Sequence, residues 1–233
     1  MVCPQGHPVF YTLWVDTLCA IRYTRKSKSE RNRKMEKTLI TISRQHGSGG
    51  TEVARILADR LGVWYYNREI LYIAADKIGF DSLDEQAMEE LNYKKSSKYM
   101  EGLSVMMGTP GHIPVYNQMY KEQGKIIQKL AGYGSGVFLG RCADYILKDF
   151  ENVTSVYLYA DDEFRQKRLS EAEGREVPMA DIKKEDKTRE SYYNYYTGQK
   201  WGDVTNYDLA LNMGKISFEE AADVILSYIE KHR

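Results

Sequence analysis

The chain has 233 residues, of which 42% are hydrophobic and 28% charged. This is the composition of a folded globular protein and excludes an intrinsically disordered chain. The 33 basic residues balance the 33 acidic ones, so the net charge gives no reason to expect a nucleic acid or a membrane as partner. Three scattered cysteines exclude a disulfide scaffold and favour a reducing, cytoplasmic location.

The first 37 residues differ from the rest. Residues 1–34 hold seven basic but two acidic residues. Their apolar stretch, residues 9–21, contains Asp16 and is too short to span a bilayer, and the basic residues follow it, whereas a secretory signal has them in front. We expect residues 1–37 to be a poorly structured extension, of which residues 1–34 would precede a true start at Met35; the alternative is a peripheral membrane contact.

From residue 38 onward, short apolar runs alternate with stretches of helical period, which predicts a parallel sheet covered on both faces. Strands are expected at residues 38–43, 63–66, 136–140, 153–160 and 207–212. Helices are expected at residues 51–61, 68–78, 83–107, 115–130, 142–149, 162–173 and 182–196. The pattern predicts one α/β domain over residues 38–233, with residues 81–134 as a helical elaboration.

A capping box of Ser217 and Glu220 predicts the start of a last helix. Its expected buried face is Ala221, Val224, Ile225, Tyr228 and Ile229.

A glycine-rich loop, SRQHGSGGTEVA at residues 43–54, separates the first strand from the first helix. Loops at this place bind phosphate in α/β proteins, because free backbone N–H groups and a helix N-terminus converge there. Against the motif G-x-x-x-x-G-K-[ST], Gly49 and Thr51 match, but Arg44 stands at the first glycine and Gly50 at the lysine. The alternative interpretation is a tight glycine turn without a ligand.

Three blocks of sequence together resemble the cytidylate kinase-like family of P-loop nucleoside monophosphate kinases: residues 40–71, 138–147 and 190–212. The resemblance implies a three-layer fold of the P-loop NTP hydrolase type, with a five-stranded parallel sheet between helices. It also implies an acceptor-binding region over residues 81–134, a mobile lid over residues 173–200, and ATP with Mg²⁺ as cofactors. The implied reaction is phosphoryl transfer from ATP to a small nucleotide, foremost CMP or dCMP. A nucleotide-binding sensor without turnover is the alternative.

On the donor side, the resemblance places the ATP phosphates on Gly47, Ser48, Gly49, Gly50 and Thr51. Thr51 is the candidate magnesium ligand, and Arg44 is the candidate replacement for the absent lysine, because a guanidinium grips two phosphate oxygens at once. A structural salt bridge is the alternative for Arg44. We expect His46 to be a phosphate ligand or a solvated or capping side chain. A side chain at Gly50 would strain the backbone if Gly50 had a positive φ.

On the acceptor side, Arg141 follows the third strand and matches the family arginine that holds the acceptor nucleotide. A pair with Asp144 is its alternative role; Asp144 would otherwise orient Arg141 towards substrate. Cys142 stands where the family has an aspartate, and this departure supports the sensor alternative. Cys142 is expected to be a small buried residue.

The lid is expected to carry catalytic arginines, because positioned cations that exclude water stabilise phosphoryl transfer. Arg189, within the stretch DKTR, and Arg175 are the main candidates. Arg165 and Arg168 share a helix face and serve either the lid or a solvated surface. The cluster YYNYYTGQKWG, residues 192–202, is expected to pack its helix on the sheet, with base stacking as the alternative.

Overall fold

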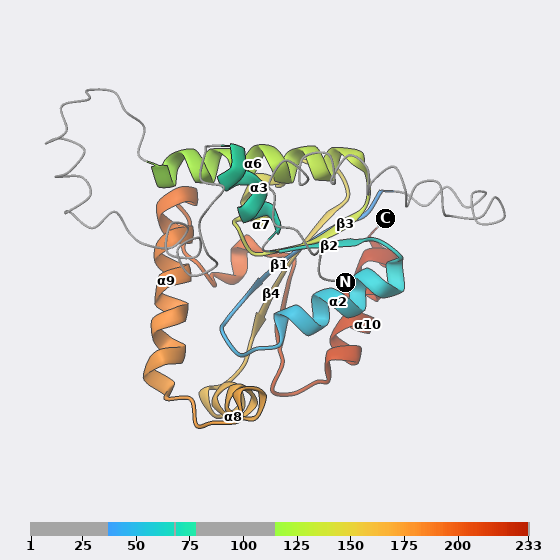
Figure 1. Cartoon of the computed structure of the whole chain (residues 1–233). Coiled ribbons are helices and arrows are strands. Elements are labelled where there is room, and N and C mark those ends of the chain that lie inside the picture. Colours follow the sequence, from blue (N-terminus) through green and yellow to red (C-terminus); the bar gives the residue numbers. More distant parts are fainter. Residues whose placement is uncertain (1–36, 68, 78–114, 233) are drawn as a thin grey trace, which may run out of the picture.

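A computed structural model describes residues 37–67, 69–77 and 115–232. Five strands form one parallel sheet in the order β2-β3-β1-β4-β5 (Figure 1). The strands are β1 (Leu39–Arg44), β2 (Trp64–Tyr66), β3 (Gly136–Leu139), β4 (Val153–Tyr159) and β5 (Leu209–Asn212). The predicted five-stranded parallel sheet is confirmed. Because the strands are parallel, all their carboxyl ends lie at one edge, which points towards α8 and α9 in Figure 1.

Helices cover both faces of the sheet. One face carries α2 (Gly50–Leu61) and α10 (Phe218–Lys231), and the other carries α3 (Glu69–Lys77), α6 (Val115–Tyr133) and α7 (Ala143–Ile146). After β4 come α8 (Asp162–Glu173), α9 (Met179–Thr197) and the short 3₁₀ helix η1 (Val204–Asn206). These three layers are the α/β P-loop architecture expected from the sequence.

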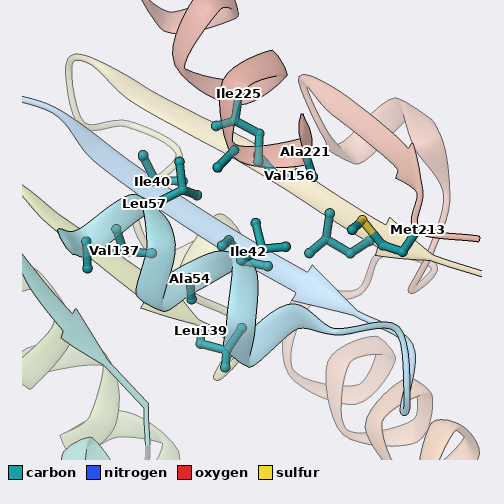
Figure 2. Close-up of a cluster of buried hydrophobic side chains, with 14 of the residues drawn as sticks. Ile40, Ile42, Ala54, Leu57, Val137, Leu139, Val156, Met213, Ala221 and Ile225 are labelled. Atoms are coloured by element: carbon teal, nitrogen blue, oxygen red, sulfur yellow. The ribbon is translucent and has the colours of Figure 1, made fainter. Parts of the chain in front are cut away.

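The alternation of side chains along β1 builds a core on each face. Ile40 and Ile42 point to the α2 and α10 face, whereas Leu39 points to the α3 and α6 face. Figure 2 shows Ile40 and Ile42 beside Ala54 and Leu57 of α2, with α10 residues completing the cluster. Every one of these side chains is at most 1% exposed. Truncation of such a residue to alanine costs about 2–5 kcal/mol of unfolding free energy, so this packing fixes the edge where β1 ends.

Several predicted boundaries are confirmed and some are wrong. The helix predicted at residues 162–173 has those bounds, and the capping box of Ser217 and Glu220 opens α10. Within the predicted buried face of α10, however, Val224 is 42% exposed, because Ala222 takes the inward position. The helix predicted over residues 142–149 is only Ala143–Ile146. Cys142, with a φ of 55°, is its N-cap, and the helix ends at Leu147, whose φ of −101° and ψ of 5° are not helical.

Parts of the prediction lie outside the described residues. These are the extension over residues 1–36, the helix predicted at residues 83–107 and most of the acceptor-binding region 81–134, of which α6 is described. Within the part of the chain that the structure describes, no helix has the length and apolar character needed to cross a membrane.

Candidate functional site

The site lies where β1 and β3 end. From β1 the chain continues to β2 on one side of the sheet, and from β3 it crosses to β4 on the other side. Ligands of open α/β sheets bind in the crevice at such a topological switch point. A hollow that is partly open to solvent occupies this place. Its lining is Ser43, Arg44, Gly140, Arg141, Cys142, Arg189, Tyr192, Tyr193 and Trp201.

Three arginines from distant parts of the chain meet in this hollow. Arg44 comes from the end of β1, Arg141 from the turn after β3, and Arg189 from α9. Among the described residues that line the hollow there is no carboxylate. The local charge is therefore positive, which suits an anion such as a phosphate group.

The path of Arg44 depends on two glycines. A Cβ atom built on Gly50 would lie 2.7 Å from Cγ of Arg44, and one built on Gly140 would overlap its guanidinium group. Arg44 therefore runs from β1 across the start of α2 to the turn after β3. It occupies the space in which a side chain at Gly50, the position of the motif lysine, would begin.

The glycine loop has the backbone of an anion site. Gly47 and Gly49 have φ values of 82° and 89°, which only glycine adopts readily. Gly49 is the N-cap of α2 and no side chain caps that helix end, so the first N–H groups of α2 are left for another acceptor. Gly50 is the first residue of α2 and its φ is not positive. The condition for backbone strain at Gly50, a positive φ, is therefore not met, and the obstacle to a side chain there is Arg44.

Ser48 and Thr51 complete the predicted donor residues. Ser48 is fully buried, and its hydroxyl donates to the backbone oxygen of Gln45 at 2.9 Å. That hydrogen bond closes the loop. Thr51 lies in the first turn of α2 and is half-buried, which is the place that the motif gives to the magnesium-binding hydroxyl.

The turn after β3 holds three consecutive residues in the left-handed region: Gly140, Arg141 and Cys142, with φ values of 71°, 60° and 55°. Left-handed conformations cost non-glycine residues about 1–2 kcal/mol each and cluster at functional sites. The turn buries Arg141 to 6% exposure and directs it into the hollow. Burial and the nearby Asp144 raise the pKa of the Cys142 thiol, so Cys142 stays protonated and unreactive, as expected of a structural cysteine.

Asp144 joins the sheet edge to α9. Its buried carboxylate accepts a hydrogen bond from the hydroxyl of Tyr193 at 2.6 Å. Burial raises the pKa of Asp144, and the hydrogen bond from Tyr193 opposes that change. Asp144 thus positions α9 against the turn that carries Arg141. It is not among the residues that line the hollow.

Arg189 and His46 contact each other beside the loop. Nη2 of Arg189 lies 3.4 Å from Nδ1 of His46, and the side chain of Arg189 is 17% exposed. The backbone N–H of His46 donates to Asp186 of α9 at 2.6 Å. His46 is therefore half-buried with its ring against Arg189, and it is not a freely solvated side chain. Burial and the arginines around it, Arg189 first, lower its pKa to about 4, so its ring is neutral at neutral pH.

Arg165 and Arg168 do not form the solvated helix face that was one expectation. Arg165 is 3% exposed and makes ion pairs with Asp162 and Asp186. Arg168 pairs with Glu52 of α2 at 2.5 Å. Both fasten α8 to the glycine loop, and Leu169 of the same helix packs against Gly47.

Arg175 is not brought into the hollow. It lies in the connection between α8 and α9, its side chain is 63% exposed, and it pairs with Glu173 at 2.6 Å. Contact with a ligand would require movement of this connection.

Aromatic side chains also line the hollow. They are Tyr192 and Tyr193 of α9, the helix that carries Arg189, and Trp201. Tyr196, by contrast, stacks on Tyr120 of α6 with ring centroids 4.0 Å apart. The cluster therefore has two kinds of contact. Tyr196 packs α9 on α6, whereas the prediction was packing on the sheet, and Trp201 does contact Tyr157 of β4. Tyr192, Tyr193 and Trp201 face the hollow.

Two contributions were missed by sequence reasoning. Gly140 clears the path of Arg44, and Asp186 ties α9 to the glycine loop. Gly140 stands directly before Arg141, so its place at a strand end was a readable signal. The contact of His46 with Asp186 spans 140 residues, and no local pattern indicates it.

No group of three or more histidine, cysteine, aspartate or glutamate residues placed to hold a metal ion occurs in the described ranges. A Mg²⁺ ion suits this site only if nucleotide phosphates and water supply most of its ligands, as they commonly do in kinases. The hydroxyl of Thr51 is the protein group placed to add to them.

Known proteins are similar to this chain over most of its length. A cytidylate kinase from Archaeoglobus fulgidus is 27% identical over 198 residues, which cover 82% of this chain and 94% of the relative. The crystal structure of an uncharacterized protein from Eubacterium ventriosum has a TM-score of 0.61 at 29% identity, covering 83% of this chain and 99% of that one. A gluconokinase structure from Sinorhizobium meliloti has a TM-score of 0.50 at 13% identity, covering 84% and 93%, and shares the fold alone.

The profile of the cytidylate kinase-like family matches residues 39–215. That match spans the glycine loop, the turn after β3 and α9, so all three arginines of the hollow lie within it. The chain belongs to the cytidylate kinase-like family.

Proposed function

We propose that this protein transfers the γ-phosphoryl group of ATP to a nucleoside monophosphate, with CMP or dCMP as the foremost acceptor. The observation that carries the proposal is the convergence of Arg44, Arg141 and Arg189 on one hollow beside the glycine loop. Phosphoryl transfer needs cations placed around a migrating, highly charged group, and little covalent chemistry from the protein.

The donor is assigned to the loop. The N–H groups at the uncapped start of α2 are free to bind the phosphates of ATP, and Thr51 is assigned to its Mg²⁺ ion. When bound, the ion neutralises charge on the phosphates. Arg44 supplies the cation that the motif lysine supplies elsewhere, because it fills the space beside Gly50.

The acceptor is assigned to the other end of the hollow. Arg141, held by the strained turn, binds the acceptor phosphate, and Asp144 positions α9 through Tyr193. The aromatic side chains of Tyr192 and Trp201 offer a flat surface for a base. We assign Arg189, which lines the hollow, to both subsites. Arg175 joins only if the α8–α9 connection closes over the nucleotide.

The test is a coupled assay with ATP, Mg²⁺ and a panel of nucleoside monophosphates. We expect turnover, fastest with CMP or dCMP. Arg60→Ala is a suitable control for the loss of an arginine, because Arg60 pairs with Asp223 at the far end of α2. Tight ATP binding without transfer to any acceptor would instead identify a nucleotide-binding sensor. This alternative is supported by Cys142, which stands where the family has an aspartate.

A further inference from the structure

One residue of the glycine loop grips α9 at two points. The backbone N–H of His46 donates to Oδ1 of Asp186 at 2.6 Å, and its ring Nδ1 lies 3.4 Å from Nη2 of Arg189. Asp186 and Arg189 are three residues apart, so they share one face of α9. The contact therefore connects the donor loop directly to the arginine that enters the hollow.

The guanidinium group of Arg189 has few other fixed contacts. Its Nε and Nη1 atoms are buried and have no hydrogen-bond partner among the described residues. The carboxylates of Asp186 and Glu185 form ion pairs with the guanidinium group, each at 3.6 Å. Asp186 is also engaged by Arg165 and by the His46 backbone. Nδ1 of His46, at 3.4 Å, lies nearer to Arg189 than either carboxylate and is within hydrogen-bond distance.

Only an unprotonated Nδ1 accepts this hydrogen bond. The charged groups around the ring come from several elements: Arg44 of β1, Arg165 and Arg168 of α8, and Asp186 and Arg189 of α9. Burial and the four guanidinium groups lower the pKa of His46 to about 4. The arginines that make the hollow attractive to an anion also keep the ring neutral, so that it accepts.

We propose that His46 is a positioning residue that aims Arg189 into the hollow through its ring Nδ1 and couples the state of the glycine loop to α9. The inference rests on the proposed function, because that function gives Arg189 its role in phosphoryl transfer. His46 acts on the reaction only through Arg189.

The first experiment needs no substrate. Nitrogen-15 NMR of the histidine rings in the full chain, with the His46 signal assigned from its loss in His46→Asn, reports the protonation of each ring nitrogen. We expect an unprotonated Nδ1 and a neutral ring at pH 6, and a higher titration point in Arg189→Ala. Protonation of Nδ1 in the neutral ring, or titration near 6.5 in the parent, would overturn the proposal.

The second experiment is single-turnover transfer from ATP to the acceptor. His46→Leu is expected to slow transfer about 10- to 100-fold, the size of effect that misplacement of a catalytic group produces. His46→Asn is expected to recover most of the rate, because its Oδ1 takes the place of Nδ1. In an Arg189→Ala background, His46→Leu should add no further loss. His232→Leu, at the exposed end of α10, is the matched control.

Independent, multiplying losses in the double variant, or an equal loss in His46→Asn and His46→Leu, would overturn the proposal. Circular dichroism on each variant separates these results from misfolding. A parent protein that transfers phosphate to no acceptor would refute the proposed function, and the NMR experiment would still decide the contact between His46 and Arg189.

Discussion

The substitution Gly50→Ala should displace the side chain of Arg44 and slow phosphoryl transfer without lowering the stability of the fold. Alanine is a better helix former than glycine by about 1 kcal/mol, and Gly50 already has a helical backbone. Its new Cβ atom, however, would lie 2.7 Å from Cγ of Arg44, closer than carbon atoms approach at their optimal separation of about 3.5–4.0 Å. Because Cγ is near the backbone, Arg44 must change its rotamer, which withdraws its guanidinium from Gly140.

The size of the effect follows from the role proposed for Arg44. Loss of one preorganised donor to a charged transition state costs about 10²–10³ in rate, or about 3–4 kcal/mol. We expect Arg44→Ala to lose this amount and Gly50→Ala to lose much of it. ATP affinity should fall less, because the backbone N–H groups of the loop remain. Arg44→Lys should recover only part of the rate, since an ammonium group lacks the two-pronged contact.

The assay is single-turnover transfer, with thermal unfolding measured on the same samples. Gly50→Ala should add no loss when Arg44 is already alanine. The substitution Gly50→Lys should slow transfer in the parent protein but speed it in the Arg44→Ala variant, because only in that variant is the space beside residue 50 empty. The reasoning is refuted if Arg44→Ala is folded and transfers phosphate at the parental rate, or if the two alanine substitutions act independently.

Three further predictions concern the acceptor, the loop and the N-terminal residues. Arg141→Ala should raise the acceptor KM or abolish turnover, while calorimetry finds ATP affinity near normal. Loss of ATP binding with acceptor binding intact would show that the donor and acceptor subsites are assigned the wrong way round. The lowered pKa of His46 means that the unfolded chain binds its proton more readily between about pH 4 and 6.5. The unfolding free energy should therefore rise with pH through this window and then level off, with a smaller rise in His46→Asn; urea titrations giving the same pH dependence for both would contradict it. Deletion of residues 1–34 should shift the melting temperature by less than about 5 °C; a larger drop would show that these residues stabilise the domain.

Much of the fold was readable from the sequence because its signals are local. The apolar run of β1 and the capping box of Ser217 each depend on neighbouring residues, and both predictions are confirmed. Boundaries failed where tertiary contacts override local preference. The predicted helix after β3 lost its start because Arg141 and Cys142 adopt left-handed backbones in the turn that forms the site.

The site was readable only in part. The glycine loop and the position of Arg141 at a strand end indicate a phosphate site by their own chemistry, and family resemblance added Arg189. The sequence did not reveal that Arg44 reaches Gly140 or that His46 meets α9, because these contacts join residues 96 and 140 positions apart. Arg165 is a further example. Its charged helix predicts a solvated face, yet the Arg165 side chain is buried and pairs with two carboxylates.

The measurement that tests the central claim most directly is phosphorus-31 NMR of ATP, Mg²⁺ and CMP mixed with the protein. If the hollow lined by three arginines is a site of phosphoryl transfer, ATP and CMP should be converted to ADP and CDP. The γ-phosphate signal of ATP and the CMP signal should then give way to the β-phosphate signals of ADP and CDP, with no inorganic phosphate. Arg60→Ala should behave as the parent does, and Arg141→Ala should be slower by about 100-fold or more. Formation of CDP at the parental rate in Arg141→Ala would contradict the account, as would ATP that stays bound and intact with every acceptor in the panel.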